Sequence, residues 1–235
     1  MGKYRISRTF ARRGEIGERG AAVMRMFGVT ADRLSENKAA INCEIEIDDG
    51  DIVYITGPSG AGKSLLLREL EKCIPASERV NLGRIKLPKN KSVIDCVDGD
   101  VLGGLRLLSI AGLGDVFCVL NEVRDLSDGQ KYRLRLAMAL ASGKKFIFAD
   151  EFCCELDAIC AAVISYNIHR HAKRAGVTFI LAGAGEDILA DLSPDVIVVK
   201  ELSGGTEIIY RQETKEQNIE HRTRNFELGS EIATA

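Results

Sequence analysis

The spacing of apolar positions changes between residues 41 and 56 and predicts two kinds of β-strand. Apolar and polar side chains alternate over residues 41–48, which is typical of a strand with one buried face. The polar run Asp48–Asp51 follows as a turn. Residues 52–56 are apolar at nearly every position, which predicts a strand buried on both faces, as in a parallel sheet.

Helical and strand patterns alternate along the rest of the chain. Helical spacing covers residues 65–73, 126–140 and 158–175, and residues 101–121 are mainly helical with glycine breaks. Buried strands are expected at residues 146–149, 177–182 and 196–199. We also predict a short strand at Ser92–Asp95, an extended piece at residues 4–10 and a helix that ends at Phe27.

Strands that alternate with helices predict an α/β fold with a mainly parallel sheet covered on both faces, and an antiparallel β portion is expected near the N-terminus. The length of 235 residues fits one main domain. Gly28 and the polar residues 35–38 suggest a boundary. We therefore assign residues 1–40 to an N-terminal basic segment, 41–212 to the domain, about 96–140 to a reduced helical arm within it, and 213–235 to a polar tail expected to be disordered.

Charge is distributed unevenly along the chain. The net charge of −2 excludes an overall polycationic nucleic-acid binder. Residues 1–25 nevertheless hold seven Lys or Arg against two acids. A solvated arm explains this basic start better than a patch that binds phosphate backbones or a membrane surface.

The cysteines indicate a reducing compartment. They number seven, and neither a secretory leader nor a small disulfide-rich domain is expected. The protein is therefore expected to be cytoplasmic. No Cys-x-x-Cys pair or Cys/His cluster with metal spacing is present, so a structural zinc site is not expected. No apolar run approaches the ~20 residues that span a bilayer, so any membrane span is expected from another protein.

The segment after residue 56 carries the strongest chemical signal. It fits G-x-x-x-x-G-K-[ST], with a predicted strand before it and a predicted helix after it. Glycines let backbone N–H groups turn toward phosphates, and the helix adds its positive N-terminal end. Lys63 is expected to reach the β- and γ-phosphates of ATP, and the Ser64 hydroxyl to bind Mg²⁺. The nucleotide-binding candidates are Gly57, Pro58, Ser59, Gly60, Ala61, Gly62, Lys63, Ser64 and Leu65.

Two acids end the apolar strand at residues 146–149. A carboxylate at the C-terminal edge of such a sheet is presented to the Mg²⁺ shell, and we assign this role to Asp150. Glu151 is the candidate general base for the attacking water. Acids often cap helices, so two acids after a strand are weak evidence by themselves. The phosphate loop upstream is what favours a catalytic role for this pair.

Leu126-Ser127-Asp128-Gly129-Gln130 opens the next helix and is followed by Asp150-Glu151 and then Leu156-Asp157. In this order the motifs closely resemble the signature, Walker B and D-loop series of ATP-binding-cassette ATPases over residues 41–199. The resemblance implies that two ATP molecules lie between two cassettes arranged head to tail. Ser127, Asp128, Gly129 and Gln130 would then serve the partner's γ-phosphate, with Asp157 at the interface. The implied partner is a second copy or a similar chain.

Two side chains of the family pattern are absent, and the residue that would stack on adenine has two candidates. The Gln expected after the strand that follows the phosphate-loop helix is absent, and Asp95 is the nearest alternative metal ligand, with Asp98 and Asp100 as competitors or a simple turn acid as the alternative. The expected His after the strand at residues 177–182 is also absent, with Gly185 in its place. Phe27 is the first candidate to stack on adenine and Tyr4 the second, although Phe27 fits a core role equally well.

The missing side chains predict slow hydrolysis without loss of nucleotide binding. The short interval from Lys63 to Ser127 reduces the arm that docks on membrane partners in transporters, and the motif residues resemble a soluble branch associated with a predicted acetyltransferase. We therefore expect a MgATP-dependent switch with an unknown effector protein. The alternatives are an ATP-gated binding module, a transporter ATPase subunit and a nucleic-acid-associated ATPase.

Overall fold

The computed structural model describes residues 2–10, 16–30, 39–202 and 204–211. The tail predicted at residues 213–235 and the boundary residues 35–38 lie outside this part. The strands are β1 Gly2–Phe10, β2 Ala39–Ile47, β3 Ile52–Thr56, β4 Arg79–Asn81, β5 Phe146–Ala149, β6 Thr178–Ala182, β7 Val196–Lys200 and β8 Thr206–Tyr210. The α-helices are α1 Glu18–Phe27, α3 Lys63–Cys73, α4 Val101–Ile110, α5 Val116–Leu120, α6 Asp128–Ala141, α7 Ala158–Ala175 and α8 Leu189–Leu192, with short 3₁₀ turns at Leu82–Arg84, Ile94–Cys96 and Val123–Asp125.

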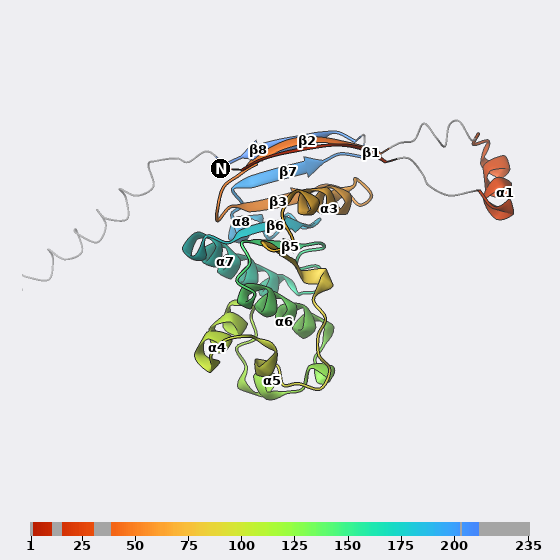
Figure 1. Ribbon diagram of the computed structural model, residues 1–235. Coiled ribbons are helices and arrows are strands. Elements are labelled where there is room, and N and C mark those ends of the chain that lie inside the picture. The colour runs from red at the N-terminus through yellow and green to blue at the C-terminus, as the bar shows by residue number, and fades with distance from the viewer. Residues whose placement is uncertain (1, 11–15, 31–38, 203, 212–235) are drawn as a thin grey trace, which may run out of the picture.

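The main sheet has six strands in the order β4-β5-β6-β3-β7-β8 (Figure 1). Neighbouring strands from β4 to β7 are parallel, and β8 joins β7 in antiparallel pairing. The predicted α/β fold with a mainly parallel sheet is confirmed. Because β3 lies between β6 and β7, the loop after β3 leaves the sheet near its middle, where strands from both sides end.

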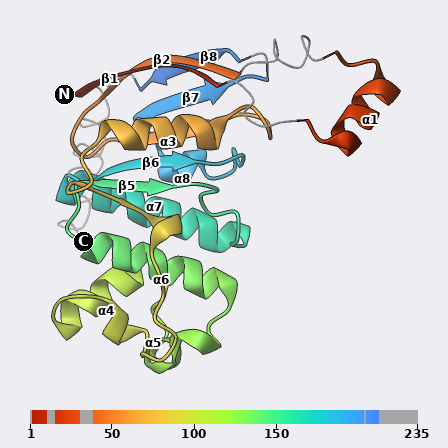
Figure 2. The same cartoon turned by 45° about the vertical axis from the view of Figure 1, so that its right-hand side comes forward.

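Alternate side chains of the central strands enter two separate hydrophobic cores. Ile52 and Tyr54 of β3 pack with α6 and α7 on one face, whereas Val53 and Ile55 pack with α3 on the other. Figure 2 shows α6 and α7 on one side of the sheet and α4 and α5 beyond α6. Burial on both faces explains why β3 is apolar at nearly every position.

The antiparallel portion is a two-stranded ribbon of β1 and β2. Its register runs from Gly2 opposite Ile47 to Phe10 opposite Ala39, and Ile6, Ile41 and Ile45 enter the same core as α3. β1 precedes the domain start that the sequence suggests at residue 41, yet it pairs with β2 along its whole length. The cause is tertiary, because these strands are joined by nearly thirty intervening residues.

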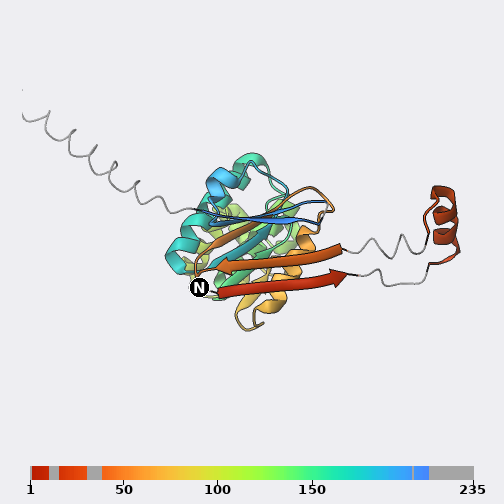
Figure 3. The same ribbon diagram turned by 90° about the horizontal axis from the view of Figure 1, so that it is seen from above.

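Helix α1 lies beyond one end of this ribbon, apart from the body of the molecule (Figure 3). It buries no side chain, and Phe27 at its end is 75% exposed. The core role considered for Phe27 is therefore wrong.

The strand predicted at Ser92–Asp95 is also wrong. Ser92 makes an isolated antiparallel bridge with Glu122, and Asp95 lies in the 3₁₀ turn Ile94–Cys96. The Ser92 hydroxyl donates to Asp95 Oδ2 at 2.6 Å, which stabilises this turn locally. The apolar residues here, such as Val93, pack beneath α4 and α6 and do not extend the sheet.

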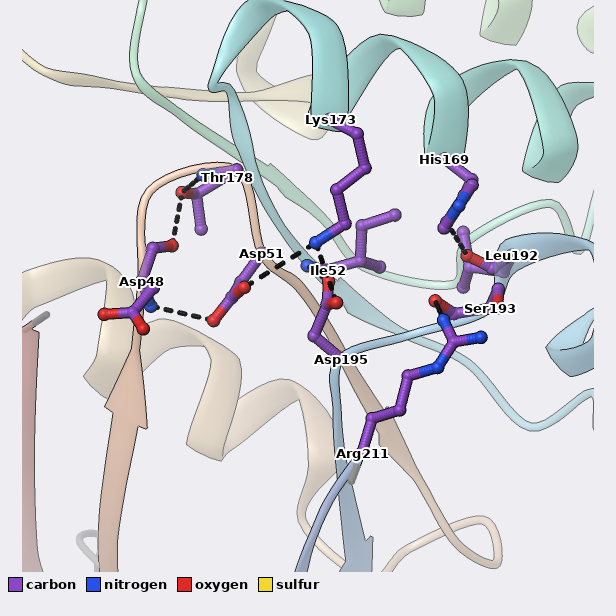
Figure 4. A network of polar contacts seen from close by, with 11 residues as sticks. Asp48, Asp51, Ile52, His169, Lys173, Thr178, Leu192, Ser193, Asp195 and Arg211 are labelled. Carbon is purple, nitrogen blue, oxygen red and sulfur yellow. Dashed lines mark hydrogen bonds and ion pairs between the residues drawn. The ribbon is translucent and has the colours of Figure 1, made fainter. Parts of the chain in front are cut away.

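A polar network lies at the other end of β3, away from the phosphate loop (Figure 4). Lys173 Nζ of α7 donates to Asp195 Oδ1 at 2.7 Å and lies 3.8 Å from Asp51 Oδ1. The Ile52 N–H donates to the other Asp195 oxygen at 2.8 Å. These contacts tie the start of β3 to α7 and to the loop before β7.

Across the described ranges, no helix combines the length and apolarity needed to cross a membrane.

Candidate nucleotide-binding site

The phosphate loop connects β3 to α3 and needs glycine at specific points. A Cβ at Gly57 would lie 2.1 Å from the Lys200 carbonyl oxygen, so any larger residue would collide with the backbone of β7. Gly62 has φ +91° and is the N-cap of α3 without any side-chain cap. No side chain therefore competes with an anion for the N–H groups at the start of α3, although the Leu65 N–H donates to the Gly62 carbonyl at 3.1 Å.

The two polar side chains that start α3 are both fixed. Lys63 Nζ donates to the carbonyl oxygens of Gly57 at 2.7 Å and Pro58 at 3.0 Å. An ammonium group has three donors, so one remains for a phosphate oxygen. The Ser64 hydroxyl donates to Asp150 Oδ1 at 2.9 Å, which joins the phosphate loop to the end of β5.

A cavity of about 810 Å³ lies over these residues. Its walls include Ser59, Gly60, Gly62, Lys63, Ser64 and Leu65 from the loop and α3, Asp150 and Glu151 after β5, and Gly183, Ala184 and Gly185 after β6. Gly57, Pro58 and Ala61 belong to the same loop but do not line the cavity. The sequence-predicted phosphate and acid residues therefore meet at the C-terminal edge of the sheet.

The Ser64 hydroxyl and the Asp150 carboxylate fit a Mg²⁺ ion. Mg²⁺ prefers oxygen ligands and takes one or two protein groups together with substrate phosphates. Within the residues that the structure describes, no cluster of three or more His, Cys, Asp or Glu side chains is arranged to hold a metal without such help. The site is thus suited to a metal that arrives with a nucleotide.

Glu151 lies in a sharp turn beside this pair. Its side chain is exposed, and its N–H donates to Asp150 Oδ1 at 3.2 Å. Cys154 Sγ is 3.9 Å from Glu151 Oε2, and burial, followed by the Glu151 carboxylate, raises the pKa of the Cys154 thiol. Glu151 is thus placed at the cavity with a neutral thiol as neighbour.

The signature residues lie outside the cavity of their own chain. Ser127 caps α6 by accepting from the Gln130 N–H at 3.2 Å, and the Gln130 side chain accepts from the Ser127 N–H at 2.9 Å. The side chain of Asp128 is 89% exposed. This reciprocal capping fixes the start of the helix while leaving its N-terminal end facing outward.

Asp157 caps α7 by accepting from the Cys160 N–H at 2.9 Å. This hydrogen bond holds the pKa of the Asp157 carboxyl below its usual range. The side chain is exposed, as an interface role requires.

Several candidates are not brought to the cavity. Asp95, Asp98 and Asp100 line a separate pocket of about 300 Å³ near α4, and Asp100 caps that helix through the Gly103 N–H. Phe27 is the last residue of α1, a helix that lies beyond the β-ribbon (Figure 3). Tyr4 packs against the core beside α3, where burial raises the pKa of its hydroxyl.

The structure adds residues that the motifs do not identify. Arg68 lines the cavity one helical turn after Ser64. The four-residue spacing from Ser64 places it on the same face of the predicted helix, so the sequence could have identified it. Tyr54 donates to the Gly185 carbonyl at 2.7 Å from within β3, and burial raises the pKa of Tyr54 to about 12. No local signal predicts this contact, because it joins positions 131 residues apart.

No protein-family model matches the chain, but the chain is similar to known ATP-binding proteins. The chain is 27% identical over 196 residues to the phosphonates import ATP-binding protein PhnC of Hyphomonas neptunium, covering 66% of this chain and 75% of that protein. It is 24% identical over 211 residues to the spermidine/putrescine import ATP-binding protein PotA of Mesoplasma florum, covering 72% of this chain and 58% of that protein.

Solved structures share the fold at low identity. The ATP-binding cassette MJ0796, in a dimeric post-hydrolysis state bound to ADP and Pi, matches with a TM-score of 0.60 and 18% identity over 75% of this chain and 94% of that one. CbiO1 from Clostridium perfringens, part of the ABC transporter complex cbiONQ, matches with a TM-score of 0.58 and 19% identity over 82% and 90%. The chain therefore has the fold of an ATP-binding-cassette ATPase domain of the P-loop NTPase class.

Proposed function

We propose that this chain binds MgATP at the interface of a head-to-tail dimer and hydrolyses it slowly to switch between open and closed states. The single observation that supports this most is the separation of the two phosphate-binding elements. The phosphate loop lines the cavity, while the capped start of α6 at Ser127 contributes no residue to its lining. A second chain is what would bring such a helix end to the γ-phosphate.

Each residue of the half-site has a distinct role in this proposal. The backbone of residues 57–65 and Lys63 bind the phosphates, and Ser64 with Asp150 would hold Mg²⁺, which would supply positive charge against the phosphate oxygens. Glu151 orients and deprotonates the attacking water. Ser127 and Gly129 of the partner would complete the site, with Asp157 at the interface.

The proposed output is movement. A γ-phosphate that both chains contact stabilises the closed dimer over the open one, because only the closed form makes all the contacts. The position assigned to the missing histidine is Gly185, which lines the cavity, and the chain has no glutamine between Lys63 and Gln130. Contacts to the transition state are thereby lost while the phosphate contacts of the ground state remain. We therefore expect ATP to close the dimer although its hydrolysis is slow.

A second candidate is supported by the relatives, which are named as import ATP-binding proteins. In that role this cytoplasmic chain would power a membrane subunit supplied by another polypeptide. Association with an acetyltransferase is a further proposal and rests on motif likeness alone. Co-purification from cells separates these partners, since the importer role requires an integral membrane protein in the complex.

Phosphate release tests the proposed hydrolysis. Wild-type protein is expected to release phosphate from MgATP, and Glu151→Gln is expected to reduce the rate by at least about 10²-fold while retaining ATP binding, because the phosphate loop is unchanged. Lys63→Ala serves as the comparison that loses binding itself. If wild-type protein binds ATP but releases no detectable phosphate, the proposed hydrolysis is wrong and the chain is an ATP-gated binding module.

A further inference from the structure

The turn after β5 holds two residues in an unfavourable backbone conformation. Glu151 has φ +52° and Cys153 has φ +61°, and neither is a glycine. Side chains make this left-handed region costly, so such conformations persist where surrounding contacts hold them. The position of Glu151 therefore depends on what fixes this turn.

The acceptors of the turn's N–H groups can be named one by one. The Glu151 N–H donates to the Asp150 carboxylate at 3.2 Å, the Phe152 N–H to the Ala182 carbonyl at 2.8 Å and the Cys154 N–H to the Glu151 carbonyl at 3.1 Å. The Cys153 N–H donates to the hydroxyl of Tyr132 at 3.1 Å. Three acceptors thus belong to the sheet or to the turn itself, and the fourth is a side chain of α6.

Tyr132 connects this turn to the helix that begins with the signature. Its side chain is 7% exposed, and burial raises the pKa of its hydroxyl well above the usual value, so it remains a neutral acceptor. Ser127 caps the same helix five residues earlier. A Cβ at Gly129 would lie 3.3 Å from the Glu155 carbonyl oxygen, so the first turn of α6 also packs against the end of this segment.

We propose that Tyr132 is a positioning residue that sets the turn carrying Glu151 according to the placement of α6. The inference rests on the proposed dimer, in which the partner's γ-phosphate binds the start of α6. When α6 binds that phosphate, the Tyr132 hydroxyl fixes the position of Cys153, and Glu151 is placed for catalysis. The glutamate of each chain is thereby set by the nucleotide bound to the other chain, which couples the two sites.

Kinetics of Tyr132→Phe test the role of the hydroxyl. The expected kcat is at least about tenfold lower, because small displacements of a catalytic group cost large factors in rate, while KM for ATP is unchanged. The matched control is Tyr210→Phe, which also removes a tyrosine hydroxyl that accepts a backbone N–H, that of Glu46 at 3.0 Å, but in the β-ribbon region. A kcat equal to wild type for Tyr132→Phe, or an equal loss in both variants, would overturn the inference.

Hydrogen exchange of the turn gives a readout that needs no turnover. In Glu151→Gln protein, MgATP is expected to slow amide exchange of residues 152–154 at least about fivefold. Exchange of these amides reports how often the turn opens locally, and a positioned turn opens less often. Adding Tyr132→Phe should abolish this slowing although the dimer still forms, and adding Ser127→Arg should abolish both. Failure of Glu151→Gln to dimerise with MgATP would contradict the proposed function, whereas a dimer whose exchange ignores Tyr132 would contradict this inference alone.

Discussion

At the residue scale, the loop after β6 is shaped by a buried tyrosine. Tyr54 is fully buried in β3 and donates to the Gly185 carbonyl. A Cβ at Gly183 would lie 2.5 Å from the Tyr54 hydroxyl oxygen, and the next Tyr54 atom is 3.2 Å away. Gly183 is therefore required by its neighbour and not by its own backbone torsions.

This contact predicts a specific non-additivity. Gly183→Ala should lower the free energy of unfolding by about 1–3 kcal/mol through overpacking, and Tyr54→Phe by about 1 kcal/mol through the lost hydrogen bond. In the double variant the two losses should be less than additive by about 0.5 kcal/mol or more, because the colliding oxygen is gone. Urea unfolding measures all three.

Gly185→Ala is the control in the same loop, since no atom lies within 4 Å of the added Cβ. It should change the free energy of unfolding little. Strict additivity of Gly183→Ala and Tyr54→Phe would show that the collision is relieved by another movement.

The motif residues of the site could be predicted from the sequence, because residues 57–64, Asp150 and Glu151 each follow an apolar strand that ends at one edge of a sheet. Tyr54 and Tyr132 could not. Both act through a hydroxyl that reaches a backbone atom far away in sequence, and each looks like an ordinary core aromatic. Asp95 failed as a candidate because its segment is a 3₁₀ turn outside the sheet.

At the element scale, strands with strong patterns were predictable and short edge strands were not. β3, β5, β6 and β7 are apolar runs next to glycine or polar turns, and all four form where expected. β4 has three residues, and β8 follows a glycine turn, so neither carries a readable period. Their strand conformation comes from pairing with β5 and β7.

His171 of helix α7 is expected to make the free energy of unfolding depend on pH. This side chain is half-buried, and burial lowers the pKa of the imidazole below 6.5. The unfolded chain therefore binds this proton more readily, so the contribution of His171 to stability is present above the unfolded pKa and is lost as pH falls through the folded one. Urea unfolding from pH 8 to pH 5 should show this loss, and His171→Gln should make the slope shallower over that window. An unchanged slope in His171→Gln would contradict the prediction.

At the scale of the whole molecule, the phosphate-binding and signature motifs lie in separate places on the described domain. The cavity combines the phosphate loop with Asp150 and Glu151, while Ser127, Asp128 and Asp157 face outward from the ends of α6 and α7. This division gives the proposed dimer its physical basis. Helix α1 is not part of this division, because it lies beyond the β-ribbon (Figure 3) and lines no part of the cavity.

The central claim is that MgATP joins two copies of this chain, and the molar mass of Glu151→Gln protein in solution tests it most directly. Light scattering after gel filtration, with and without MgATP, gives that mass at the same protein concentration. The predicted result is a nucleotide-dependent dimer, because slowed hydrolysis preserves the shared γ-phosphate. Adding Ser127→Arg should return it to the mass seen without nucleotide. A monomer of about 25.6 kDa in both conditions would contradict the account.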